Sequence, residues 1–253
     1  MTWSLEKDCV VWSRHGWQLS MDLSKAAQGL QLANPSRDNY QENVFSLRLA
    51  STLERPYDAY VRGDDWVAKF AEDEDRNFGI QLDCRILHSN AESIVLDYWF
   101  SVQTPTLSSH PVVGLDFEEM VGTDRVLHYR PERSSLRDVA VIDELPAVAE
   151  MTKPCPEHSA ALGLRGTQRH PVYTLMMVHP TDQRDISWSR ASDGDPENKA
   201  ADGLRLHLFG EFMEKGVLRR ARLRFIASVR ALNADALDHL YRAFLDSPLP
   251  LDT

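Results

Sequence analysis

Cysteine is scarce in this sequence, with only Cys9, Cys84 and Cys155 among 253 residues. Their odd number and wide spacing give no disulfide framework, which is typical of proteins in a reducing compartment. The first residues include three consecutive charged side chains, at positions 6–8, and no apolar segment of the kind that forms a signal peptide. We therefore expect a cytoplasmic protein.

Long apolar runs are also absent, since none reaches the length of about 18 residues that a membrane-spanning helix needs. Basic residues are outnumbered, with 28 Lys and Arg against 38 Asp and Glu, and the net charge is −10. Such a charge repels the phosphates of nucleic acids and anionic membranes. We expect neither as a partner, and the sequence gives no indication of the oligomeric state.

Several common catalytic motifs are missing from the chain. It has no G-x-S-x-G, no phosphate-binding P-loop, no G-x-G-x-x-G and no H-E-x-x-H, which excludes the commonest hydrolase, nucleotidase, dinucleotide oxidoreductase and zinc-protease classes. Cys155 and His158 are close enough to share a metal, but a structural zinc site needs a second such pair. We expect no metal and no cofactor.

What the sequence does contain is alternation of apolar and polar residues, the pattern of half-buried β-strands. The segment NVFSLRLAS (43–51) alternates in this way. Residues 58–69 alternate on both sides of Gly63-Asp64 and predict a hairpin that places Asp58 opposite Lys69.

Residues 80–102 predict a second hairpin around a loop at 90–92. One register sets Cys84 opposite Tyr98 on the apolar face and Arg85 opposite Asp97 on the polar face. Because a single register satisfies both faces, the hairpin is strongly indicated.

The rest of the chain completes the expected fold. Further alternating segments follow residue 104, a polar stretch at 192–203 predicts a mobile loop, and residues 21–30 indicate a short helix. Residues 233–246 carry an apolar stripe at helical spacing and end before Pro248. We therefore expect a mainly-β protein, a single domain over residues 1–253 formed by a large antiparallel β-sandwich with a C-terminal helix.

The most distinctive segment is residues 204–227, where Arg220, Arg222 and Arg224 occupy every second position. A third hairpin, turning near Lys215-Gly216, would set leucines against apolar residues on one face. The same register would place His207 opposite Arg224 on the other face.

The arginine row has two interpretations. Each guanidinium can pair with one of the many acidic side chains and form a salt-bridged face. Alternatively, Arg220, Arg222 and Arg224 bind an anion, since a guanidinium matches a carboxylate or phosphate through two parallel hydrogen bonds, with His207 as a hydrogen-bonding neighbour. The sequence alone leaves both open.

One tryptophan departs from the apolar pattern. Trp99 falls on the polar face of its predicted strand, with Asp83, Arg85 and Asp97. An aromatic ring among hydrogen-bonding groups is typical of a sugar-binding surface, whereas a covering layer would make it part of the core.

The functional expectation combines these candidates. We expect binding of a small carbohydrate or anionic metabolite on a sheet face, with catalytic residues unidentified. One alternative is a sugar-modifying enzyme of the epimerase or mutarotase kind, using His128, His179 or His207 as acid or base. The other is a structural or interaction protein with no small-molecule site.

Overall fold

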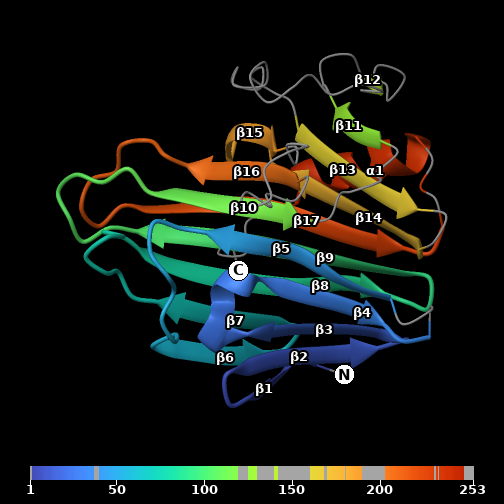
Figure 1. Cartoon of the computed structure of the whole chain (residues 1–253), viewed down its shortest axis with the longest axis horizontal. Coiled ribbons are helices and arrows are strands. Elements are labelled where there is room, and N and C mark those ends of the chain that lie inside the picture. Colours follow the sequence, from blue (N-terminus) through green and yellow to red (C-terminus); the bar gives the residue numbers. More distant parts are fainter. Residues whose placement is uncertain are drawn as a thin grey trace, which may run out of the picture.

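Two antiparallel sheets packed face to face make up most of the protein, and a helix lies in its C-terminal part (Figure 1). The predicted mainly-β sandwich with a C-terminal helix is confirmed. The computed structural model describes residues 2–36, 40–118, 125–129, 140–141, 160–167, 170–179, 181–189, 203–230, 232 and 234–247. The loop expected at 192–203 lies outside the described residues except for its last position.

Neighbouring strands in the sheets are often far apart in the sequence. Within the described residues, one sheet has the order β1 (Ser4–Glu6), β2 (Cys9–Arg14), β3 (Trp17–Asp22), β4 (Leu30–Asn34), β5 (Tyr40–Arg48), β10 (Val112–Glu118), β16 (Gly203–Phe209) and β15 (Gln183–Ser189). The other has the order β12 (Ala140–Val141), β11 (Arg125–Tyr129), β13 (Ala160–Thr167), β14 (His170–Val178), β17 (Leu218–Ser228), β9 (Ser93–Gln103), β8 (Gly79–Ser89), β7 (Asp65–Phe70) and β6 (Asp58–Arg62). We call them the eight-stranded and the nine-stranded sheet.

The core lies between the two sheets and is built from alternate residues of each strand. Phe45 of β5 contacts Tyr98 and Phe100 of β9 edge to face, with ring centroids 5.0 and 5.7 Å apart. On β17 the inward residues include Leu223 and Phe225. The residues between them, including the arginines of β17, therefore point to the outer face of the nine-stranded sheet.

Both hairpins predicted in the first half of the chain are confirmed in their register. In β6–β7, Asp58 lies opposite Lys69, and the two side chains form an ion pair of 2.9 Å. In β8–β9, Cys84 lies opposite Tyr98 and Arg85 opposite Asp97. Alternation fixed these registers because a slip by one residue would have turned every apolar side chain to the outer face.

Residues 4–34 form four strands that the alternation analysis did not identify. One of their turns is built by His15 and Gly16, both with positive φ (53° and 86°), the backbone of a tight hairpin turn. The helix expected at 21–30 is a 3₁₀ segment, Leu23–Gln28, interrupted by a non-helical Lys25.

The hairpin predicted for residues 204–227 is wrong. Strand β16 pairs with β10 and β15 in the eight-stranded sheet, whereas β17 pairs with β14 and β9 in the nine-stranded sheet. At the end of β16, Phe209 and Gly210 have positive φ (64° and 91°), and the chain crosses from one sheet to the other. Met213 of this crossing segment is buried in the core. Two strands alternate in the same way whether a hairpin joins them within one sheet or the chain crosses to the other sheet. The sequence pattern therefore could not distinguish the two connections.

Helix α1 (Ala234–Leu245) covers part of the outer face of the nine-stranded sheet. Its Tyr241 and Phe244 are buried against Leu175 of β14 and Ile226 of β17. Figure 1 shows the helix beside β14, at one end of the sheet. The cover is therefore local, and the face further along β17, β9 and β8 carries polar side chains.

Candidate functional site

The outer face of the nine-stranded sheet carries buried and half-buried ion pairs. Arg224 donates to both carboxylate oxygens of Asp97, at 2.6 and 2.9 Å, and the two side chains are only 6% and 5% exposed. The guanidinium also lies 5.0 Å from the ring centroid of Phe244. Arg85 donates in the same forked manner to Asp65 of β7, at 2.6 and 2.8 Å. Arg85 and Asp97 are thus opposite each other in register but are bonded to different partners.

The other two arginines of the row also have acidic partners. Arg222 donates its backbone N–H and its Nε to Asp182, at 2.9 and 3.2 Å. Arg220 donates Nε to Ser101 at 2.8 Å and lies 3.7 Å from Asp83. The geometry matches the salt-bridged interpretation of the row, because each guanidinium has a carboxylate within 4 Å.

The environment of Asp83 changes the pKa of its carboxyl group. Burial raises its pKa, while hydrogen bonds from the Gln81 amide, at 3.0 Å to each oxygen, and the charge of Arg220 oppose that rise. The group is therefore a weaker acid than an exposed aspartate.

Trp99 lies on this outer face, between Arg222 and Asp83 in the register. It is only 5% exposed, and the Arg85 guanidinium lies 5.7 Å from its ring centroid. The ring is covered, so it offers little surface on which a sugar could stack.

His207 lies on the other side of the molecule. It belongs to β16, opposite Gly114 of β10, while its neighbours Leu206 and Leu208 point into the core. The predicted pairing of His207 with Arg224 is therefore wrong, because the core separates the two side chains.

Of the three histidines proposed as an acid or base, the structure describes the side chains of His179 and His207, and these two lie apart. His179 follows β14 and bonds to the Thr181 hydroxyl at 2.8 Å, beside Arg222 and Asp182. His128 lies on β11, whose side chains are outside the described part of the structure. His179 follows a strand of the nine-stranded sheet, whereas His207 lies on β16 of the eight-stranded sheet.

We expect the free energy of unfolding to fall as the pH drops below about 6.5, with His179 contributing. Burial, followed by the charge of Arg222, lowers its pKa, and Asp182 only partly opposes this. The unfolded chain therefore takes up the proton at a higher pH than the folded protein does. Melting temperatures between pH 7.5 and 5.5 should fall less for His179→Gln than for the native protein. An equal fall in both would contradict this role.

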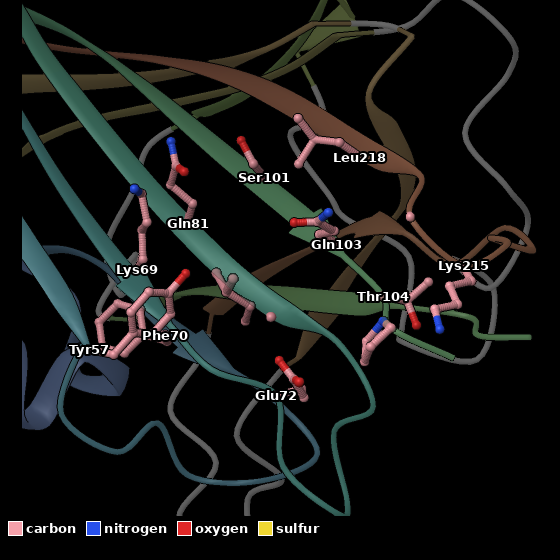
Figure 2. Close-up of a pocket in the computed structure, with 14 residues that line it drawn as sticks. Tyr57, Lys69, Phe70, Glu72, Gln81, Ser101, Gln103, Thr104, Lys215 and Leu218 are labelled. Atoms are coloured by element: carbon pink, nitrogen blue, oxygen red, sulfur yellow. The ribbon is translucent and has the colours of Figure 1, made fainter. Parts of the chain in front are cut away.

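A pocket of about 350 Å³ lies on the same outer face, at the end that α1 does not cover. Figure 2 shows that Lys69, Gln81 and Ser101 come to it from the neighbouring strands β7, β8 and β9. The residues that line it are Tyr57, Lys69, Phe70, Glu72, Gly79, Ile80, Gln81, Ser101, Gln103, Thr104, Pro105, Lys215, Gly216 and Leu218.

Several polar groups in this pocket are held by the protein itself. Lys69 is paired with Asp58, Gln81 with Asp83, and Ser101 accepts a hydrogen bond from Arg220.

Thr104 connects the loops around the pocket. It donates to the carbonyl of residue 77, and its own carbonyl accepts from the N–H of Gly216 at 3.0 Å. These contacts join three loops and give the pocket a fixed wall.

A second set of groups in the pocket has no hydrogen bond or ion pair with any described residue. It comprises the side chains of Tyr57, Glu72, Gln103 and Lys215. Tyr57 is 70% exposed, so its ring is open to solvent. An aromatic ring, a carboxylate, an amide and an ammonium group are thus available to a ligand at one place.

The backbone also shapes this pocket. Gly79 occupies an outward position of β8, and a Cβ there would lie 3.2 Å from the carbonyl oxygen of Phe70 and 3.8 Å from Glu72 Oε2. A side chain would crowd this part of the pocket. The glycine therefore keeps it open.

Sequence reasoning missed the pocket, although it found the sheet face. Tyr57 precedes β6 in a segment without alternation, and Glu72 and Lys215 lie in loops between strands. The exposed aromatic in ERPYDAY (54–60), next to a confirmed hairpin, was the available signal.

Comparisons with known proteins show a likeness of fold. No family model matches the chain, and no curated protein matches it. A solved structure of a TPR-domain containing protein from Parabacteroides distasonis superposes with a TM-score of 0.54 at 10% identity, over 97% of this chain and 50% of that one. A putative kojibiose phosphorylase from human microbiome gives a TM-score of 0.35 at 6% identity, over 93% and 35% of the two chains. The chain thus spans half or less of each of these proteins.

Two further findings concern metals and membranes. Among the described residues, no group of three or more histidine, cysteine, aspartate or glutamate side chains is arranged to hold a metal ion. In that same part of the chain, no helix is both long and apolar enough to cross a bilayer.

Proposed function

We propose that this protein binds a small carbohydrate in the pocket on the outer face of the nine-stranded sheet. The observation that carries the proposal is the exposed ring of Tyr57 beside the side chains of Glu72, Gln103 and Lys215, which have no hydrogen bond or ion pair with a described residue. A sugar presents C–H groups that pack on an aromatic ring, and hydroxyls that donate to a carboxylate and exchange hydrogen bonds with an amide.

This pocket suits such a ligand better than the row of Arg222 and Arg224. Both arginines are bonded to aspartates, and a ligand at Arg224 would have to displace a nearly buried pair from beneath Phe244. In the pocket, by contrast, the side chains of Glu72, Gln103 and Lys215 have no ion pair with a described residue that the ligand would have to break. Arg220 contributes to binding only indirectly, since its hydrogen bond to Ser101 helps to fix the wall of the pocket.

We expect Tyr57→Ala to weaken carbohydrate binding by about tenfold, which corresponds to about 1.4 kcal/mol. The change removes the stacking surface but no group that holds the sheet. The measurement is a thermal-shift screen of neutral sugars and sugar acids, followed by calorimetric titration of the best binder.

Phe212→Ala is the matched control, because Phe212 is another exposed aromatic residue and does not line the pocket. It should leave the affinity unchanged. Equal affinity of the native protein and Tyr57→Ala, or no binding by any sugar, would refute the proposal.

A further inference from the structure

A second pocket lies where two chain segments cross between the sheets. One is the turn from β14 to β15, around residues 181–182, and the other runs from β16 to β17 through residues 210–217. The pocket has a volume of about 490 Å³, and three arginines are among the residues that line it: Arg184, Arg219 and Arg220. In a protein with a net charge of −10, such a concentration of arginine is unexpected.

Gly210 allows one of these arginines to lie close to the backbone. Its φ is +91°, and a Cβ at this position would collide with the guanidinium of Arg184. The absence of a side chain therefore places this guanidinium against the crossing segment, at the pocket wall.

The two carboxylates at the pocket differ in how firmly they are held. Asp182 accepts hydrogen bonds from both the backbone N–H and the side chain of Arg222, and these bonds hold its carboxylate against β17. Glu211 pairs with Arg219, but these side chains are 67% and 43% exposed. An exposed pair of this kind contributes little to stability, so a ligand can replace it at little cost.

We propose that this pocket binds a tetrahedral oxyanion, a phosphate or sulfate group, between Arg184 and Arg219. Guanidinium groups present parallel N–H donors that match two oxygens of such an anion and keep their charge at all physiological pH values. Arg220 also lines the pocket, but its guanidinium donates to Ser101 at 2.8 Å and lies 3.7 Å from Asp83, so it adds positive charge nearby without contacting the anion.

The test is calorimetric titration with inorganic phosphate and sodium sulfate at constant ionic strength. We expect saturable binding to the native protein and a loss of at least about tenfold in affinity in Arg184→Gln/Arg219→Gln, since both charge-assisted contacts are removed. Arg230→Gln is the matched control, because Arg230 is exposed and pairs with Glu92 outside this pocket. It should bind like the native protein.

Glucose 6-phosphate distinguishes the sources of the anion. Affinity equal to that of inorganic phosphate would support a site for the free ion, and much higher affinity would support a site for a phosphorylated metabolite. Tyr57→Ala should leave phosphate binding unchanged, so this proposal stands or falls independently of carbohydrate binding. The proposal would be overturned if neither phosphate nor sulfate binds, or if the native protein and the double variant bind them equally well.

Discussion

Asp97→Ala is expected to destabilise the protein by about 3–5 kcal/mol, because it leaves the charge of Arg224 buried without a partner. Arg224 donates two hydrogen bonds to Asp97 and lies beneath Phe244 of α1. With the carboxylate removed, the guanidinium must either stay uncompensated or reach water by displacing the helix. For a chain of this size the loss corresponds to a fall in melting temperature of roughly 6–20 °C.

Two further variants distinguish the stability lost by leaving a buried charge unpaired from the stability lost by removing a side chain. Glu92→Ala removes an exposed carboxylate that pairs with Arg230, and it should cost less than about 1 kcal/mol. Asp97→Leu/Arg224→Met replaces the whole pair by apolar groups and should recover most of the stability lost in Asp97→Ala. A small loss in Asp97→Ala, similar to that in Glu92→Ala, would contradict the description of this pair as buried.

Arg76→Ala should have the second largest effect, a destabilisation of about 2–4 kcal/mol, because buried acceptors lose their donor. Arg76 is almost fully buried and donates to the backbone carbonyls of Ala71, at 2.6 Å, and Phe78, at 3.1 Å. It also forms an ion pair of 3.3 Å with Asp73. These contacts close the loop between β7 and β8, which carries Glu72 at the edge of the pocket.

The variant therefore links stability to binding. We expect Arg76→Ala to lower both the urea midpoint and the affinity for the carbohydrate, since Glu72 is no longer held in place. Arg55→Ala is the control, because Arg55 is an exposed arginine that pairs with Asp8 away from this loop. A change in stability without any change in affinity would show that Glu72 has no part in binding.

The parts of the fold that were predicted correctly depend on contacts between neighbours in the sequence. In both confirmed hairpins a short turn joins the strands, so alternation and one charge pair, such as Asp58 with Lys69, were enough to define the register. The C-terminal helix was found for a similar reason, since its apolar stripe is a local pattern.

The parts that could not be predicted depend on which strands become neighbours. Strand β17 alternates equally well whether it pairs with β16 or with β9, and only the structure shows that Arg224 meets Asp97. The three arginines do share one face of β17, but their separation from His207 follows from the crossing at Gly210. The pocket combines Tyr57, Lys215 and side chains from three adjacent strands, a set that no local pattern brings together.

The central claim is that the outer face of the nine-stranded sheet holds the ligand site, and mapping of backbone amide chemical shifts tests it most directly. The best-binding sugar would be titrated into isotope-labelled protein. The proposal predicts that the largest shifts gather at Tyr57, Gly79, Gln103 and Gly216, around the pocket. Shifts centred on Arg48 and Asp116, on the outer face of the eight-stranded sheet, would contradict it.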